Sequence, residues 1–147
     1  MMNPDTTKIV ARDVMKASKC IKKDIEISKV LEMFIKGGVD FLSVIDDEKR
    51  LIGAISESNF MKIVKQDSKS PIGDAVWYRK VEPDDLKKTA DSIMTTDITT
   101  IRPEDDIATV LKVMNSVGYR FVNVTDAEGK LLGALRLTEI LRKLVGV

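Results

Sequence analysis

Two polar side chains stand three positions apart after a short apolar run, in the stretch "GAISESN" that covers residues 53–59. This order predicts a strand that leads into a helix, with Ser56 as the N-cap and Asn59 in the first helical turn. The unpaired backbone N–H groups at such a helix start favour a phosphate or a polar sugar. The same Ser-x-x-Asn spacing is also typical of an ordinary helix cap that binds nothing. Both interpretations are open on the spacing alone.

The chain contains the same stretch a second time, as "GALRLTE" at residues 133–139. The similarity extends far beyond the turn, because residues 20–64 align with residues 100–144 without a gap. Upstream, "ARDVM" at 11–15 matches "ADSIM" at 90–94. The chain is therefore an internal duplication.

Each repeat predicts the order strand, helix, strand, strand, helix. In repeat 2 a short strand at 99–101 precedes a helix that Pro103 opens and Gly118 ends, and two β-rich runs flank the turn "AEGK". Repeat 1 predicts the corresponding series, with a helix at 28–37, strands at 41–45 and 51–55, and a helix at 57–65. A single unit of this length buries little surface, so we expect the two to pack face to face. The predicted organisation is repeat 1 at 8–65, a linker at 66–88 and repeat 2 at 89–147.

Composition excludes several classes of function. The net charge of +1 and the scattered lysines argue against nucleic acid as a partner. No apolar run approaches the length of a membrane span. The chain has no histidine and one cysteine, Cys20, so we expect no zinc site, a His-based catalytic arrangement is excluded, and a reducing, cytoplasmic location is expected. We expect no catalytic residues, no metal site and no enzyme activity.

The polar linker is interrupted by Trp77 and Tyr78. One interpretation is that these aromatic side chains pin the linker onto the core. The other is that they line a dimer interface or cover a ligand, since exposed aromatic residues often mark contacts.

The duplicated pattern resembles the CBS-domain pair, also called a Bateman module, over about residues 8–147. The marks that carry the resemblance are "DVM" and "SIM" before each first strand, "TIRPEDDI", "GYRFVNVTD" and "KLLGALRLTEIL". The resemblance implies an α/β fold of two β-α-β-β-α repeats related by a pseudo-twofold axis. It also implies clefts that hold adenine nucleotides or related adenosyl ligands, and pairing into a disc-like homodimer.

The family's ribose-binding signature is met in full by the first turn. The resemblance implies that a hydroxyl and an amide there hold vicinal ribose hydroxyls, with Gly53 allowing close approach. The resemblance also implies that residues of repeat 2 complete this cleft. Among them, Arg120 corresponds to a phosphate-binding basic residue. Tyr119 either stacks near the base or packs at a strand edge. The implied nucleotide-binding residues are Gly53, Ile55, Ser56, Asn59, Thr100, Ile101, Tyr119, Arg120 and Phe121.

The second turn departs from the signature, because Arg136 and Glu139 replace the hydroxyl and the amide. Asp40 stands where the other cleft has its arginine, and a carboxylate repels phosphate. We expect an ion pair of Arg136 with Asp40 or with Glu139 to fill this second cleft. Its implied residues are Cys20, Ile21, Val39, Asp40, Phe41, Arg136 and Glu139.

The resemblance thus implies a regulatory module that senses an adenine nucleotide such as AMP, ADP or ATP, or a related adenosyl ligand. It would pass occupancy to a regulated protein, which the sequence does not identify, through a homodimer. No cofactor is required, and Mg²⁺ enters only if the ligand is ATP. The alternative is a ligand-free structural or protein-interaction module whose clefts are filled by side chains.

Overall fold

The computed structural model describes residues 9–67 and 78–147. The chain divides into two compact units, which are described separately. Unit one contains residues 9–19, Ile45–Leu51 and Asp97–Val147, and unit two contains Cys20–Val44 together with residues 52–67 and 78–96. Each unit is a mixed sheet covered by helices, so the predicted α/β class with two repeated strand–helix units is confirmed.

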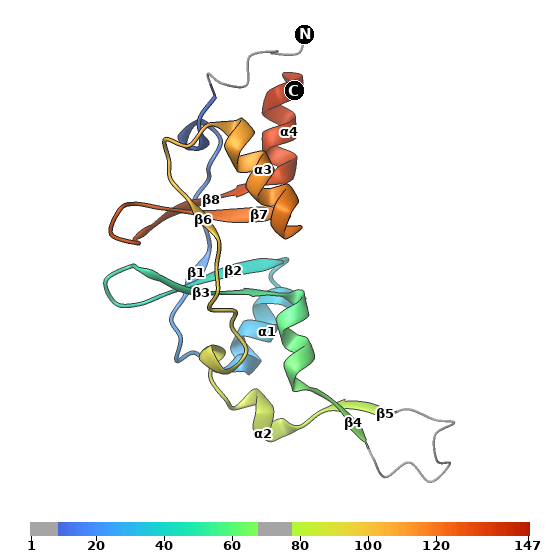
Figure 1. Ribbon diagram of the computed structural model, residues 1–147. Coiled ribbons are helices and arrows are strands. Elements are labelled where there is room, and N and C mark those ends of the chain that lie inside the picture. Colours follow the sequence, from blue (N-terminus) through green and yellow to red (C-terminus); the bar gives the residue numbers. More distant parts are fainter. Residues whose placement is uncertain (1–8, 68–77) are drawn as a thin grey trace. The chain divides into compact units, whose positions relative to one another are not determined.

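Unit one carries the strands and helices of repeat 2. Its sheet has the order β6-β7-β8, with β6 parallel to β7 and β7 antiparallel to β8. Helices α3 and α4 cover one face of this sheet (Figure 1). Helix α3 begins after Asp106, whose carboxylate accepts a hydrogen bond from Thr109 N at 2.7 Å, and it ends at Gly118 with φ of 72°. The elements are β6 (Thr100–Ile101), α3 (Ile107–Val117), β7 (Phe121–Thr125), β8 (Leu131–Arg136) and α4 (Leu137–Val145).

Unit two carries the corresponding elements of repeat 1, with the sheet order β1-β2-β3. The final helix differs from the prediction of 57–65. It is a 3-10 helix, η3 (Glu57–Ile63), and the chain then continues as a strand that pairs with a second strand from the predicted linker. The elements are β1 (Cys20–Ile21), α1 (Ile27–Ile35), β2 (Phe41–Ile45), β3 (Leu51–Ser56), η3, β4 (Val64–Asp67), β5 (Tyr78–Val81) and α2 (Pro83–Leu86).

The segment that precedes the first strand of each repeat is called its leading segment, and it packs on the sheet of the other repeat. Ile9, Ala11 and Val14 lie in the hydrophobic core of unit one, with the strands of repeat 2. Ala90 and Ile93 lie in the core of unit two, with the strands of repeat 1. The compact units therefore exchange their leading segments, and their boundaries differ from those of the sequence repeats.

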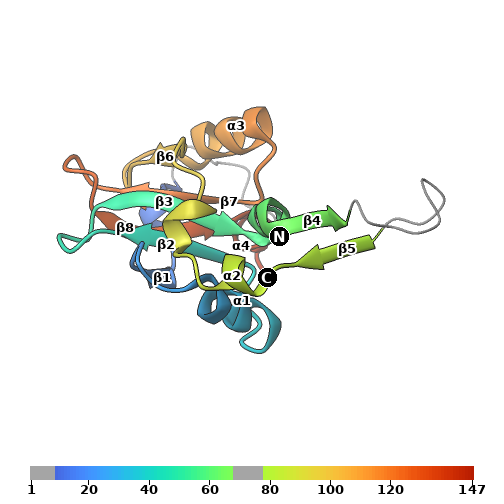
Figure 2. The ribbon, with the colours of Figure 1, turned by 90° about the horizontal axis from the view of Figure 1, so that it is seen from below.

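The predicted linker forms part of unit two. Strands β4 and β5 make an antiparallel ribbon that extends away from the three-stranded sheet (Figure 2). Asp85 in α2 is 4% exposed, and its carboxylate pairs with Lys65 at 2.9 Å and Lys88 at 3.0 Å. Hydrogen bonds from these two lysines lower the pKa of Asp85 below its usual value. Trp77 and the side chain of Tyr78 lie outside the described residues.

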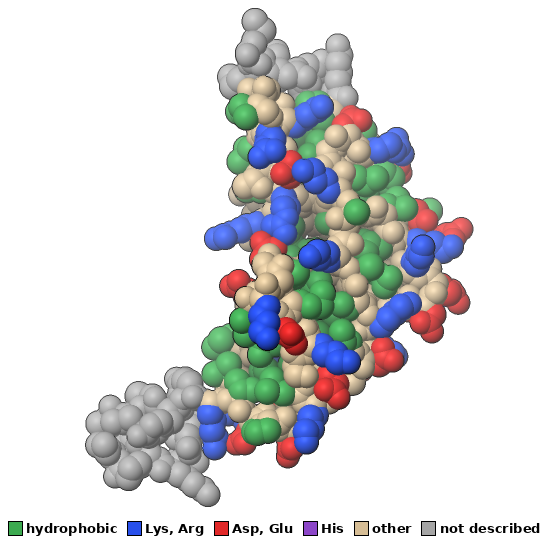
Figure 3. All heavy atoms as spheres, turned by 180° about the vertical axis from the view of Figure 1, so that it is seen from behind, with side chains coloured by type: hydrophobic (Ala, Val, Ile, Leu, Met, Phe, Trp, Pro, Cys, Tyr) green, Lys and Arg blue, Asp and Glu red, His purple; other side chains and the backbone are tan. Residues whose placement is uncertain are grey.

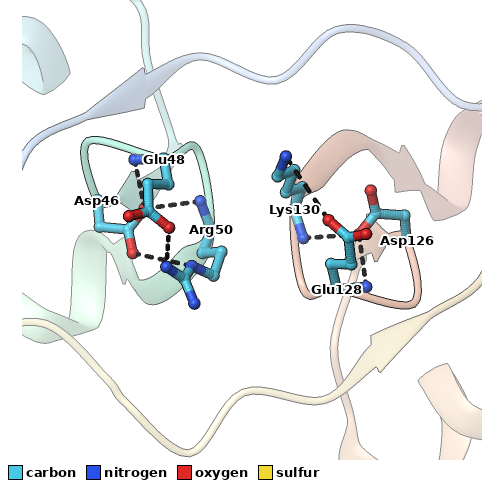
Figure 4. A network of polar contacts seen from close by, with 6 residues as sticks. All are labelled: Asp46, Glu48, Arg50, Asp126, Glu128 and Lys130. Atoms are coloured by element: carbon cyan, nitrogen blue, oxygen red, sulfur yellow. Dashed lines mark hydrogen bonds and ion pairs between the residues drawn. The ribbon is translucent and has the colours of Figure 1, made fainter.

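The two β-hairpin turns have the same construction (Figure 4). In the first, Asp46 Oδ1 accepts hydrogen bonds from the backbone of Glu48 and Arg50, both at 2.9 Å. In the second, Asp126 Oδ1 accepts from the backbone of Glu128 at 2.8 Å and Lys130 at 2.9 Å. The turns also pair with each other, since Leu51 N donates to Gly129 O at 3.0 Å and Leu131 N donates to Lys49 O at 2.9 Å. Asp46 and Asp126 are thus explained as turn-forming residues.

Candidate functional site

The turn of repeat 1, Ser56–Asn59, lies where β3 ends and η3 begins. Ser56 occupies the N-cap position, as predicted, and is half-buried. Its backbone N–H donates to Asn59 Oδ1 at 2.9 Å, and its hydroxyl donates to the same oxygen at 3.1 Å. The Ser58 hydroxyl lies 3.2 Å from the Ser56 hydroxyl and is exposed. The turn therefore presents two neighbouring hydroxyl groups.

Asn59 is buried, with 7% of its surface exposed. Its amide nitrogen donates to Ile93 O at 2.6 Å and to Thr95 Oγ1 at 3.0 Å. The Ile93 carbonyl also accepts from Lys62 Nζ at 3.2 Å. Asn59 thus joins the turn to the leading segment of repeat 2, within unit two. Sequence reasoning missed these partners, because nothing in the local spacing of the turn points to a segment more than thirty positions away.

Gly53 is explained by packing in this unit. A Cβ atom at this position would lie 2.5 Å from Met94 Sδ. Packing against the Met94 side chain therefore requires a glycine at this position, and the close approach of a ligand to its backbone stays a prediction. Ile55 is fully buried in the core of unit two, so its side chain serves packing.

The turn of repeat 2, residues 136–139, is held by ionic and aromatic contacts. Glu139 pairs with Lys16 at 3.2 Å, and the guanidinium of Arg136 lies 5.7 Å from the centroid of the Phe121 ring. The sequence predicted Asp40 or Glu139 as the partner of Arg136, and those two pairings stay predictions. The contacts with Lys16 and Phe121 were not predicted. Arg136 and Phe121 face each other across the β7–β8 pair, so the alignment of the two strands brings together residues that the resemblance assigned to different clefts.

The other predicted residues of unit one lie along β6 and around the start of β7. Tyr119 is 44% exposed and Arg120 is exposed, so both side chains are available to a ligand. Thr100 is exposed as well, whereas Ile101 is buried in the core at 3% exposure. The Arg120 carbonyl accepts a hydrogen bond from Leu137 N at 2.7 Å, which fixes the backbone that carries the guanidinium.

The predicted second-cleft residues of unit two surround β1 and the start of β2. Cys20 and Asp40 are exposed and Phe41 is half-buried. Ile21 and Val39 are each 8% exposed and belong to the hydrophobic core. The apolar members of this set therefore build the unit, and only Cys20, Asp40 and Phe41 present side chains at its surface.

Charge is distributed without a dominant sign. Lysine and arginine side chains alternate with acidic ones over the face shown in Figure 3. Within residues 9–67 and 78–147, no group of three or more Cys, Asp or Glu side chains could hold a metal ion. Over the same residues, no helix is long and apolar enough to cross a membrane.

Known proteins resemble this chain at low sequence identity. The protein CBSX2 of the Arabidopsis thaliana chloroplast is 23% identical over 134 residues, which cover 83% of this chain and 56% of that protein. The chain thus spans little more than half of this relative. Uncharacterized protein MJ1426 of Methanocaldococcus jannaschii is 21% identical, with 93% of this chain and 92% of that protein covered.

Solved structures share the fold. A CBS domain-containing protein of unknown function from Bacillus anthracis has a TM-score of 0.76 at 20% identity, with 93% of each chain covered. CBSX2 in complex with AMP has a TM-score of 0.72 at 22% identity, covering 91% of this chain and 94% of that chain. The CBS domain pair of protein MJ0100, in complex with 5′-methylthioadenosine and S-adenosyl-L-methionine, has a TM-score of 0.68 at 19% identity, covering 90% and 97%.

The protein-family model of the CBS domain matches the sequence of this chain twice, at residues 9–66 and 90–146. These matches include both turns and both leading segments, which are the features that the duplication and the packing single out. The chain belongs to the CBS-domain family, as a pair of CBS domains.

Proposed function

We propose that this protein is a regulatory module that binds an adenosyl ligand, an adenine nucleotide or a relative of it, and carries out no catalysis itself. One observation carries the proposal: the turn of repeat 1 keeps the full Gly-x-x-Ser-x-x-Asn pattern in a CBS pair, and its hydroxyl groups stand at the surface. Support also comes from related CBS pairs, whose structures contain AMP in one case and 5′-methylthioadenosine with S-adenosyl-L-methionine in another.

We assign the polar contacts to side chains that have an exposed donor or acceptor. The Ser56 hydroxyl lies beside the exposed Ser58 hydroxyl, and because a hydroxyl can both donate and accept, this pair is suited to bind a ribose hydroxyl. The exposed Arg120 guanidinium suits a phosphate by its geometry and charge. Tyr119 offers an exposed ring for stacking on the adenine.

We infer that the turn of repeat 2 does not bind the ligand. Glu139 is engaged with Lys16, and Arg136 covers Phe121. A ribose at this turn would have to displace charged side chains and would find no hydroxyl at position 136. One nucleotide per chain is therefore expected.

Isothermal titration with AMP, ADP, ATP and S-adenosylmethionine tests the proposal directly. At least one of them should give saturable heat with a stoichiometry near one per chain. Mass spectrometry of the small molecules that copurify with the protein would identify the natural ligand. The absence of heat with all four compounds at millimolar concentration would rule the function out.

Arg120→Ala and Arg142→Ala form a matched pair for the phosphate assignment. Both remove an exposed arginine of unit one, but Arg142 lies in the last turn of α4 and has no assigned role. Arg120→Ala should abolish most nucleotide binding and leave adenosine binding nearly unchanged, whereas Arg142→Ala should alter neither. Equal losses from the two variants would indicate a general effect of charge and reject the assignment.

The alternative is a ligand-free interaction module. It is favoured by one specific observation, which is that the Asn59 amide has all of its hydrogen-bonding positions filled by the protein. The two proposed functions predict different effects of adenosyl compounds on the melting temperature, because a ligand that binds only the folded state raises it. An unchanged melting temperature with every adenosyl compound would favour the interaction module.

We also propose that the chain acts as a homodimer in a reducing, cytoplasmic setting and signals to a separate regulated protein. Leu141 and Val145, one helical turn apart on α4, are 47% and 46% exposed and offer apolar surface for pairing. Light scattering during size-exclusion chromatography measures the state directly. Mg²⁺ should affect binding only if ATP is the ligand, since the described residues supply no metal-binding cluster of their own.

A further inference from the structure

An ammonium group lies beside the turn of repeat 1. Lys62 Nζ donates a hydrogen bond to Ile93 O at 3.2 Å, and the Asn59 amide nitrogen donates to the same carbonyl at 2.6 Å. Asn59 Oδ1 in turn accepts from the Ser56 hydroxyl at 3.1 Å. Lys62 and Asn59 are three positions apart in the 3-10 helix η3, in which side chains at this spacing lie directly above one another. The Lys62 ammonium is therefore on the side of η3 that carries the polar groups of the turn.

The charge of this ammonium is not balanced by a neighbouring acid. Among the described residues, no carboxylate forms an ion pair with Lys62, whereas Lys65, three positions further on, is paired with the buried Asp85 at 2.9 Å. An ammonium has three N–H donors, and the bond to Ile93 O uses one of them. Lys62 is exposed, so its other donors and its positive charge are available to a bound molecule.

Adenosyl ligands differ in the charge that they carry at the 5′ position. AMP has a phosphate there, 5′-methylthioadenosine has a neutral sulfur, and S-adenosylmethionine has a positively charged sulfonium. The 5′ carbon is attached to the ribose ring, so this charge stays close to the protein groups that hold the ribose hydroxyls. A nearby ammonium attracts a phosphate and repels a sulfonium, by an amount that depends on distance and on screening by solvent.

We propose that Lys62 sets the charge selectivity of the adenosyl-ligand site, so that the site prefers a ligand with an anionic 5′ group, such as AMP, over one with a cationic 5′ group, such as S-adenosylmethionine. This inference rests on the proposed function, because it needs an adenosyl ligand whose ribose lies at the Ser56 and Ser58 hydroxyls. It adds a residue that lies outside the Gly-x-x-Ser-x-x-Asn pattern and that the sequence prediction did not single out.

The variant Lys62→Met removes the charge and keeps a long side chain. Isothermal titration of the full chain with AMP, 5′-methylthioadenosine and S-adenosylmethionine measures the effect. Relative to the wild type, the affinity for AMP should fall by about fivefold and that for S-adenosylmethionine should rise by a similar factor, the scale of an interaction between partly exposed charges. The affinity for the neutral 5′-methylthioadenosine should stay unchanged. Both changes should shrink at high salt, because they are electrostatic.

Two further variants separate charge from structure. Lys62→Arg keeps the positive charge, and it should keep the wild-type order of the three affinities. Arg142→Met removes a positive charge at the position of repeat 2 that aligns with Lys62, in the last turn of α4, and it should change none of the three affinities. The neutral ligand adds an internal control. Its affinity would fall in Lys62→Met if losing the hydrogen bond to Ile93 O damaged the turn itself.

The outcomes separate this inference from the proposed function. A wild-type protein that binds S-adenosylmethionine more tightly than AMP would overturn the selectivity and leave the proposed function in place. The same holds if Lys62→Met changes all three affinities by one common factor, which indicates a structural role, or changes none of them. If the wild type binds none of AMP, ADP, ATP, 5′-methylthioadenosine and S-adenosylmethionine, the proposed function fails and this inference fails with it.

Discussion

The turns of the two repeats are built alike but are held by different forces. In unit two, Ala54 pairs with Thr95, and in unit one, Ala134 pairs with Lys16 through hydrogen bonds of 2.9 and 3.0 Å. Each turn then adds a side-chain connection to the leading segment that pairs with its own strand. Asn59 makes it with buried, neutral hydrogen bonds, whereas Glu139 makes it with an ion pair to the exposed Lys16.

This difference shows that duplication preserved the docking of the leading segments and left the side-chain connection free to change. A neutral connection is insensitive to salt, and an exposed ion pair is screened. It also shows that a polar residue in a binding signature can be required by the fold, so a signature match alone does not identify a ligand contact.

We expect the largest effect on the free energy of unfolding when the neutral hydrogen bonds between Asn59 and the leading segment of repeat 2 are lost. Asn59→Ala should lower the free energy of unfolding by about 3 kcal/mol, because it removes buried hydrogen bonds and leaves their partners unsatisfied. Glu139→Ala should cost less than about 1 kcal/mol, since Lys16 is mostly exposed. Urea denaturation at low and high salt measures both, and only the cost of Glu139→Ala should shrink with salt. Equal costs would remove the distinction between the turns.

The next effect compares the glycines that precede the turns. A Cβ atom at Gly133 would lie 2.7 Å from the Lys16 carbonyl oxygen, which is backbone, whereas at Gly53 it meets the Met94 side chain. Backbone must move as a unit, while methionine can change rotamer. Gly133→Ala should therefore destabilise the protein by about 2 kcal/mol, and Gly53→Ala by less. A larger cost at Gly53 in urea denaturation would contradict this account.

A smaller effect is expected at the tips of the two hairpins. Lys49 has a φ of 65°, and the equivalent Gly129 has a φ of 82°. Only glycine adopts this left-handed backbone conformation without steric cost. Lys49→Gly should therefore stabilise the fold by about 1 kcal/mol, and Gly129→Lys should destabilise it by a similar amount. Thermal unfolding followed by circular dichroism measures both. A destabilised Lys49→Gly would indicate that the lysine side chain contributes more than its backbone strain costs.

The last comparison concerns pH and the Asp85 cluster of unit two. The two lysines lower the pKa of Asp85, so its contribution to stability is present above the usual carboxyl pKa and is lost as the pH falls through the lowered value. Urea denaturation between pH 7 and pH 3 should show a smaller loss of stability for Asp85→Asn than for the wild type. Parallel curves for the two proteins would contradict a lowered pKa.

Much of the fold could be predicted because the duplication places the same pattern on the chain twice. The helix end at Gly118, the hairpins and the N-cap position of Ser56 all follow from local spacing. The β4–β5 ribbon could not be predicted, since "VKQD" and "YRKV" show no apolar alternation and are joined through pairing with each other. The partners of Asn59 and Glu139 were missed for a related reason. They lie on leading segments that pack against the other repeat, and local sequence does not report such contacts.

The exchange of leading segments also dictates the order in which a newly made chain can be completed. Every described residue of unit two precedes Asp97, so this unit can close while the rest is still being synthesised. Unit one requires residues 9–19, which are made before unit two, to wait for β8 and α4, which are made after it. During synthesis, unit two would therefore be complete before the segments on either side of it could join to form unit one.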